Sequence, residues 1–172
     1  MRVLFVCTGN ICRSPMAERL VNAYTTRLGI PTLRASSAGI RAVIGHPIQP
    51  DAALVLQQLG GETNDFAARQ LSSKIASEAD LVLTMTRAHR DAVLELAPRQ
   101  LHRTFTLGVA SQLVSELGAQ TIGDLAVLRP QLSGEDQFDI PDPIGQSADF
   151  HAMVGSQIAS FLPPIIELLQ SE

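Results

Sequence analysis

Aromatic residues and cysteines are scarce in this chain. It has no tryptophan, one tyrosine and two cysteines among 172 residues, and no long run of lysine or arginine. Proteins that bind nucleic acids usually present a basic stripe or a platform of aromatic side chains, so we expect no nucleic-acid partner. The two cysteines have no second cysteine or histidine pair at zinc-ligand spacing, so we expect no metal site.

Long apolar segments are also missing. The longest tracts fall short of the roughly 20 residues that cross a bilayer, and two prolines interrupt residues 161–169, so we expect no membrane span. A strand pattern begins directly after Met1 and Arg2, which leaves no room for a cleavable signal peptide. We therefore expect a cytoplasmic protein, in a compartment that keeps thiols reduced.

The remaining composition is that of one ordinary domain. Hydrophobic residues make up 45% of the chain and charged residues 17%, and 13 Lys and Arg stand against 17 Asp and Glu. Strand patterns alternate with helix patterns, which predicts a single-domain α/β fold over residues 1–172, with a four-stranded parallel sheet in a three-layer α/β/α arrangement. The expected strands are residues 2–6, 32–38, 81–85 and 103–107, and the expected helices are residues 14–28, 49–59, 74–79, 87–96 and 148–169.

Residues 108–139 form an extended segment that this pattern explains least. Residues 111–117 and 122–128 each have a composition that suits a helix. A connection of this length is usually functional or partly disordered. Two interpretations stay open, a solvated insertion without a catalytic role and a cover over the substrate cleft.

The most informative segment is residues 7–14, Cys-Thr-Gly-Asn-Ile-Cys-Arg-Ser, which joins a buried strand to the start of a helix. The amides of such a loop and the helix N-terminus favour an oxyanion, and the planar fork of Arg13 suits bidentate contact with phosphate. The same positive surroundings favour the thiolate of Cys7, the expected nucleophile. The remaining residues of this phosphate-binding loop are Thr8, Gly9, Asn10, Ile11, Cys12 and Ser14.

The segment from Val6 to Glu18 closely resembles the signature of the low-molecular-weight protein tyrosine phosphatases. The similarity extends through residues 36–39, 79–85 and 142–145, so it touches most of the chain. The resemblance implies an enzyme, a protein-tyrosine phosphatase that hydrolyses phosphomonoesters of protein substrates. It implies no metal or other cofactor. The sequence does not determine the oligomeric state, and a monomer is favoured.

The resemblance assigns three catalytic roles. Cys7 is the nucleophile that forms a phosphocysteine, Arg13 binds the phosphate, and Asp142, before Pro143, is the general acid and then the base for the attacking water. Asn10 and Ser14 match residues that support the loop. Three further acidic residues lie near Asp142, and Asp142 is favoured because the following proline restricts its backbone to extended conformations. These competitors are Glu135, Asp136 and Asp139.

The second thiol, Cys12, is open to two interpretations. In the family that the chain resembles, a disulfide with Cys7 would protect the nucleophile from irreversible oxidation and act as a reversible off-switch. The alternative is a small residue that fills the loop. The four histidines show no common pattern, and we expect surface or helix-packing roles for all of them, His46, His89, His102 and His151.

The sequence leaves the choice of substrate open. Family members that act on phosphotyrosine usually have aromatic side chains at the cleft, but residues 40–46 and 144–145 contain none. Ile11, Val43, Ile44 and Ile144 could supply apolar walls instead. A protein-arginine phosphatase is the alternative, although a threonine is associated with phosphoarginine specificity where this chain has Ile11. A second alternative is a non-catalytic module that binds phosphoproteins.

Overall fold

The computed structural model describes residues 1–170, which contain a four-stranded parallel sheet. Its strands stand in the order β2-β1-β3-β4. All four predicted strands are present, and the last two are shorter than expected because the chain turns into a loop or helix sooner. Their bounds are β1 (Arg2–Cys7), β2 (Arg34–Gly39), β3 (Leu81–Thr84) and β4 (Thr104–Thr106).

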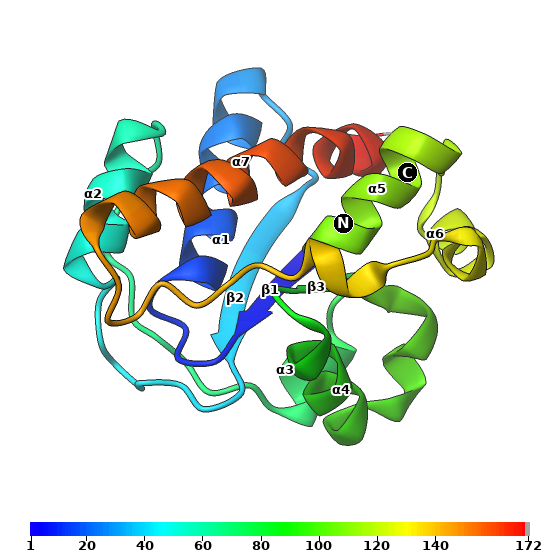
Figure 1. Ribbon diagram of the computed structural model, residues 1–172, viewed down its shortest axis with the longest axis horizontal. Helices are drawn as coiled ribbons and strands as arrows, with labels where there is room; N and C mark the ends of the chain where they lie inside the picture. Colours follow the sequence, from blue (N-terminus) through cyan, green and yellow to red (C-terminus); the bar gives the residue numbers. More distant parts are fainter. Residues whose placement is uncertain (171–172) are drawn as a thin grey trace.

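Helices cover both faces of this sheet, which confirms the three-layer arrangement (Figure 1). Because side chains alternate along a strand, Val3 and Phe5 of β1 pack against one set of helices, and Leu4 and Val6 against the other. The first face carries α1 (Arg13–Leu28), α2 (Pro50–Gln58), α5 (Leu107–Leu117), α6 (Ile122–Leu128) and α7 (Ala148–Gln170). The second face carries α3 (Ser73–Ser77) and α4 (Arg87–Leu96).

The carboxyl ends of the strands meet at one edge of the sheet. β1 ends at Cys7, β2 at Gly39 and β3 at Thr84, and the strand order reverses around β1. In open parallel sheets, ligands bind outside this edge at such a switch point. The loop of residues 8–12 therefore lies where the topology places a binding site.

The segment 108–139 is not a long loop. α5 begins directly after β4, and its residues Val109, Ala110 and Leu113 are buried in the core. The compositions of residues 111–117 and 122–128 did indicate helices, but α5 starts four residues earlier than that pattern suggested. After α6, the chain continues through two short 3-10 helices, Arg129–Gln131 and Glu135–Phe138. Most of residues 108–139 are therefore helical.

The last helix, α7, has 23 residues and is largely apolar, although the sequence showed no uninterrupted apolar run of that length. By length and composition it is long and apolar enough to cross a membrane. Part of its apolar character serves the core, because Val154, Ile158 and Ile165 are buried against the helices of the first face. Pro163 and Pro164 lie inside this single helix and do not divide it.

Candidate active site

The backbone of the loop after β1 is hydrogen-bonded to the segment that follows β2. The carbonyl groups of Cys7, Thr8 and Gly9 accept hydrogen bonds of 3.0 Å from the amides of Ile40, Arg41 and Val43, respectively. In a planar trans peptide the N–H points opposite to the C=O. The amides that follow these carbonyls therefore point away from residues 40–43, toward the inside of the loop. Inward N–H groups in succession make an anion-binding concavity.

The N-terminus of α1 opens into the same loop. Its N-cap residue, Cys12, provides no side-chain hydrogen bond, and its first turn contains no acidic residue. In contrast, side chains cap α4, α5 and α6. An uncapped helix start leaves its N–H groups and its partial positive charge available to an anion. This difference supports a phosphate site at α1.

A buried side-chain network fixes the shape of the loop. Asn10, which is fully buried and has a φ of 56°, donates hydrogen bonds to the hydroxyls of Ser14 (2.9 Å) and Ser37 (2.8 Å). Its carbonyl oxygen accepts a hydrogen bond from the backbone amide of Arg69 at 2.9 Å. Gly39, the last residue of β2, lets the loop approach this strand closely, since a Cβ at Gly39 would collide with the carbonyl oxygen of Thr8. The expected supporting role of Asn10 and Ser14 fits this geometry.

Cys7 lies at the bottom of the loop. Its side chain is 2% exposed, and its sulfur lies 2.9 Å from the hydroxyl oxygen of Ser14. A hydroxyl at this distance can donate to a thiolate and stabilise it. The thiol therefore lies next to the first turn of α1, where the helix N-terminus favours negative charge.

Arg13 and Asp142 meet beside this loop, although they are far apart in the sequence. The guanidinium of Arg13 is buried, donates to the carbonyl oxygen of Ile140 at 2.9 Å and lies 3.3 Å from the carboxylate of Asp142. The Asp142 side chain is 51% exposed. Its other oxygen accepts a hydrogen bond from the amide of Ile144 at 3.2 Å. A carboxyl group that is half open to solvent can exchange protons and still point into the site.

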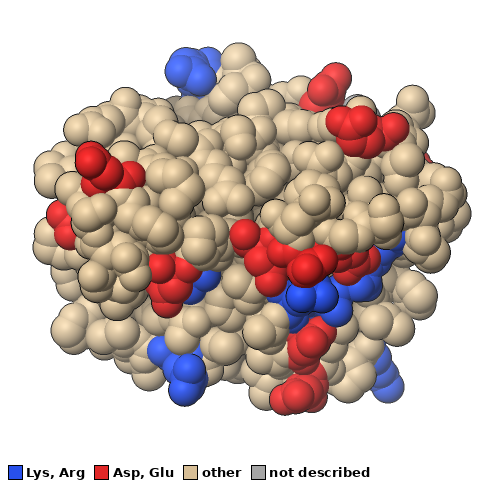
Figure 2. Space-filling model, in the orientation of Figure 1, with Lys and Arg blue, Asp and Glu red and all other residues tan. Residues whose placement is uncertain are grey.

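Two of the three acidic neighbours of Asp142 have other partners. Asp139 accepts a hydrogen bond from the first amide of α4, that of Arg87, at 3.0 Å. Glu135 pairs with Arg90 and Arg129, and these contacts, with Arg129 first, lower its pKa below the usual range. Acidic and basic side chains are interleaved on the surface where the segment before Asp142 meets α4 (Figure 2). Of the four carboxylates considered from the sequence, the structure brings Asp142 to Arg13.

Comparison with known proteins agrees with this geometry. Residues 2–115 match the family model described as low molecular weight phosphotyrosine protein phosphatase. The chain belongs to this family. It is a phosphoric monoester hydrolase of the protein-tyrosine-phosphatase type, as its relatives are named.

Two curated relatives show how far the similarity reaches. The Wzb phosphatase of Salmonella typhi is 36% identical over 107 residues, which cover 62% of this chain and 68% of the relative. The probable phosphatase EpsP of Ralstonia nicotianae is 37% identical over 110 residues, covering 64% of this chain and 72% of the relative. These relatives thus match the chain over somewhat more than half of its length.

Two solved structures match nearly the whole chain. The low molecular weight protein tyrosine phosphatase from T. tengcongensis has a TM-score of 0.77 and 32% identity, with 97% of this chain and 98% of that one covered. The YwlE arginine phosphatase from Geobacillus stearothermophilus has a TM-score of 0.76 and 31% identity, with 99% and 93% covered. The fold is thus shared by proteins with different named substrates.

The second thiol of this phosphatase differs electrostatically from a typical surface cysteine. Cys12 is 4% exposed, and both cysteines are free. Burial, with the nearby negative charge of Cys7 as the next cause, raises the pKa of Cys12 to about 12. At neutral pH Cys12 is therefore a protonated thiol, unsuited to act as a competing nucleophile.

Sequence reasoning missed four residues that support the phosphatase loop. His89 of α4 is buried, and its Nε2 lies 2.9 Å from the hydroxyl oxygen of Thr8, so the expected surface or packing role was incomplete. Burial, and then the charge of Arg13, lowers the pKa of His89 to about 4, so the ring is neutral at pH 7. No spacing signal in the sequence pointed to this contact. The other three residues are Glu18, Ser37 and Arg69, which continue the Asn10 network.

The loops that follow β2 and Asp142 carry exposed aliphatic side chains. Val43, Ile44 and Ile144 are exposed large hydrophobic residues on the two loops beside the site. A Cβ on Gly9 would lie 3.5 Å from both Ile11 and Val43, so these two side chains flank the same part of the loop. That these side chains form apolar walls around a substrate stays a prediction.

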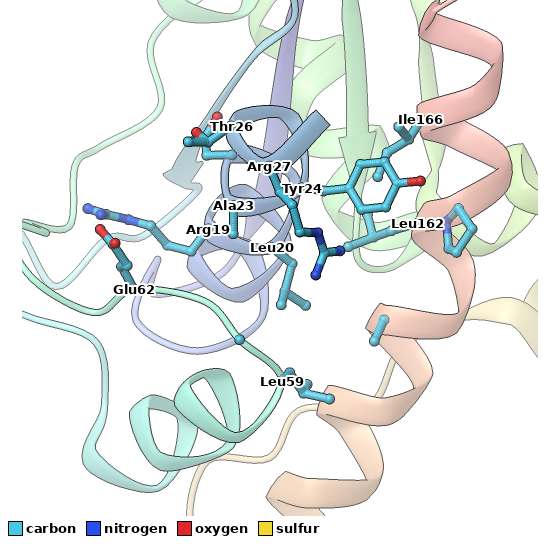
Figure 3. Close-up of a pocket in the computed structure, with 14 residues that line it drawn as sticks. Arg19, Leu20, Ala23, Tyr24, Thr26, Arg27, Leu59, Glu62, Leu162 and Ile166 are labelled. Atoms are coloured by element: carbon cyan, nitrogen blue, oxygen red, sulfur yellow. The ribbon is translucent and has the colours of Figure 1, made fainter. Parts of the chain in front are cut away.

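A separate pocket lies between α1 and α7 (Figure 3). It has a volume of about 550 Å³, and its walls include Leu20, Tyr24, Leu59 and Leu162. None of the residues that the sequence assigned to the active site lines it. Among residues 1–170, no group of three or more His, Cys, Asp or Glu side chains is arranged to hold a metal ion.

Proposed function

We propose that this protein hydrolyses phosphotyrosine in protein substrates through a phosphocysteine intermediate. The observation that carries the proposal is the ion pair of Arg13 with Asp142 at the end of the loop that begins at Cys7, whose side chain is buried. A nucleophile, a phosphate-binding cation and a proton donor thus share one site. Mere recognition of a phosphoprotein would need neither the thiol nor the carboxyl group.

In the first step, the Cys7 thiolate attacks the phosphorus in line with the ester oxygen. The loop amides and the Arg13 guanidinium bind the non-bridging oxygens, where charge is held in the transition state. The bond to the ester oxygen breaks, and Asp142 gives its proton to the departing phenolate. Before this step, the phosphate of the bound substrate takes the place beside Arg13 where the Asp142 carboxylate lies at 3.3 Å.

In the second step, the Asp142 carboxylate takes a proton from a water molecule that attacks the phosphocysteine. Inorganic phosphate leaves, and Cys7 returns as a thiolate that the hydroxyl of Ser14 can stabilise. Asp142 thus serves as acid and then as base. Its half-exposed position suits both roles because it can reach water and substrate.

Phosphoarginine is the second candidate substrate, because an arginine phosphatase resembles the chain over 99% of its length. Against it stands Ile11, whose apolar side chain suits the ring of an aryl ester better than a charged guanidinium. The aliphatic residues Val43, Ile44 and Ile144 give the same preference. They would pack on a phenyl ring without stacking.

The deciding experiment compares kcat/KM for one peptide carrying either phosphotyrosine or phosphoarginine. We expect the wild type to prefer phosphotyrosine, Cys7→Ser to hydrolyse neither peptide, and Ile11→Thr to shift the preference toward phosphoarginine. A wild-type preference for phosphoarginine would overturn the substrate assignment. Phosphopeptide binding without hydrolysis would instead support the non-catalytic module.

We further propose that the protein acts as a monomer in the cytoplasm, where its two thiols stay reduced, and that Cys12 protects Cys7. Peroxide would convert Cys7 to a neutral sulfenic acid, which removes the Cys7 charge that helps to raise the pKa of Cys12. Cys12 would then condense with the sulfenic acid to a disulfide and release water. A thiol would then restore activity. The measurement is recovery after peroxide treatment, which Cys12→Ser should lose if the disulfide forms.

A further inference from the structure

The segment that carries Asp142 is attached to the rest of the site by very few bonds. The amide of Ile140 donates to the carbonyl oxygen of Met85 at 2.9 Å, and its carbonyl oxygen accepts from Arg13 at the same distance. Only Pro141, whose ring fixes φ, separates this fully buried residue from Asp142. The backbone position of Asp142 therefore depends on the bonds that hold residues 139 and 140.

Asp139 is bound to the start of α4. One carboxylate oxygen accepts the Arg87 amide at 3.0 Å, and the other lies 3.9 Å from the Arg87 guanidinium. A negative charge at a helix N-terminus is stabilised by the free N–H groups there. One turn further, Arg90 pairs with Glu135 at 3.3 Å, which attaches the preceding 3-10 helix to α4 as well.

The same turn of α4 contacts the phosphate loop. His89 lies between Arg87 and Arg90 in the sequence, and its Nε2 is 2.9 Å from the hydroxyl oxygen of Thr8. Thr8 directly follows the nucleophile Cys7. The ring is 4% exposed and its Nδ1 has no hydrogen-bond partner, so the contact with Thr8 is the one polar contact found for this ring within residues 1–170.

We propose that the first turn of α4 sets the position of the general acid relative to the nucleophile, with Asp139 and His89 as its two positioning residues. Asp139 holds the acid segment and His89 holds the phosphate loop. The inference rests on the proposed function, because it assumes that Asp142 protonates the leaving group. It assigns a role in catalysis to two side chains that do not touch the substrate.

The proposal has two parts, which should differ in their kinetics: the hold of Asp139 on the acid segment (the acid arm) and the hold of His89 on the phosphate loop (the loop arm). Protonation by Asp142 matters for a poor leaving group such as phenol and hardly for 2,4-dinitrophenol, which leaves readily as an anion. A displaced acid therefore lowers kcat/KM for phenyl phosphate but not for 2,4-dinitrophenyl phosphate. A displaced phosphate loop weakens contacts that both substrates share. Loss of stability alone would not produce either pattern in a folded sample.

For the acid arm, we expect Asp139→Ala to lower kcat/KM for phenyl phosphate about tenfold and to leave 2,4-dinitrophenyl phosphate within about twofold of wild type. Asp139→Asn keeps an oxygen that can accept the Arg87 amide, so it should recover part of the loss. Asp136→Ala, an exposed residue in the same segment, is the matched control. An unchanged ratio of the two substrates in Asp139→Ala would overturn this arm.

For the loop arm, we expect His89→Ala to lower kcat/KM for both substrates by the same factor and to raise the inhibition constant of inorganic phosphate. His89→Gln places an amide where Nε2 stands and should restore both values. Values for His89→Ala within twofold of wild type would overturn this arm. All variants are assayed well below their melting temperatures.

These outcomes are separable from failure of the proposed function. If the wild type is active, Cys7→Ser is inactive and Asp142→Asn shows no dependence on the leaving group, then the acid role of Asp142 is wrong and the acid arm falls with it. If Asp142→Asn shows that dependence and Asp139→Ala does not, the proposed function stands and the positioning role of Asp139 is rejected.

Discussion

The phosphate loop and the acid segment form one site but are built in opposite ways. Cys7 and Arg13 are 2% and 4% exposed and belong to a continuous stretch in which the side chains of Cys7, Asn10 and Ser14 are bonded to one another. Asp142 is half exposed. Its carboxylate contacts Arg13 and the Ile144 amide, and Arg13 also binds the carbonyl oxygen of Ile140. Anion binding needs many fixed donors, whereas proton transfer needs one carboxyl group in contact with water. Substitution of a supporting side chain such as Asn10 should therefore lower stability, whereas substitution of Asp142 should lower turnover with little change in stability.

The largest expected effect is on turnover, in the acid segment. We expect Asp142→Asn to lower kcat/KM for phenyl phosphate by about 10²–10³-fold, because the amide cannot donate the proton that the leaving group needs. The melting temperature and the affinity for inorganic phosphate should change little, since the side chain is half exposed. Steady-state kinetics with Asp136→Asn as control checks this prediction, and wild-type activity in Asp142→Asn would refute it.

The next largest effect is on stability, in the phosphate loop. Asn10→Ala leaves Ser14, Ser37 and the Arg69 amide without their buried partner, and we expect it to lower the free energy of unfolding by about 2–3 kcal/mol. Urea denaturation measures the change. Asn64→Ala, on an exposed residue, should stay within about 0.5 kcal/mol of wild type. Equal effects of the two substitutions would show that the network does not stabilise the loop.

The smallest effect concerns the pH dependence of stability. Burial lowers the pKa of His89 from 6.5 to about 4 in the folded protein. Between these values the unfolded chain binds a proton that the folded protein does not, so His89 lowers stability as the pH falls from 6.5 to 4 and has no such effect above 6.5. Over that range we expect wild type to lose about 2 kcal/mol more than His89→Gln.

Chemical denaturation of both proteins at several pH values checks this. Partly buried Glu18, whose pKa is raised by desolvation, has the opposite dependence, because its contribution to stability is lost as the pH rises through its folded pKa. That contribution is the same in both proteins and cancels in their difference. Parallel curves for wild type and His89→Gln would mean that His89 is not kept neutral by its surroundings.

Local patterns determined much of this protein. The run of residues 2–6 predicted a buried strand, the glycine, asparagine and serine of residues 9–14 predicted a tight loop before a helix, and the alternation along the chain predicted the parallel sheet. These features depend on neighbours within a few residues, where steric and hydrogen-bonding preferences act directly. The candidate nucleophile and phosphate-binding arginine could be found for the same reason.

Contacts between distant segments were decided only by the tertiary structure. The sequence could favour Asp142 over Asp139 through the neighbouring proline, but only the fold shows that Asp139 is bound to α4 while Asp142 reaches Arg13. Nothing near His89 in the sequence indicated that it would meet Thr8. Such pairs form because the sheet brings the ends of its strands to one edge, and burial then gives each polar group few partners.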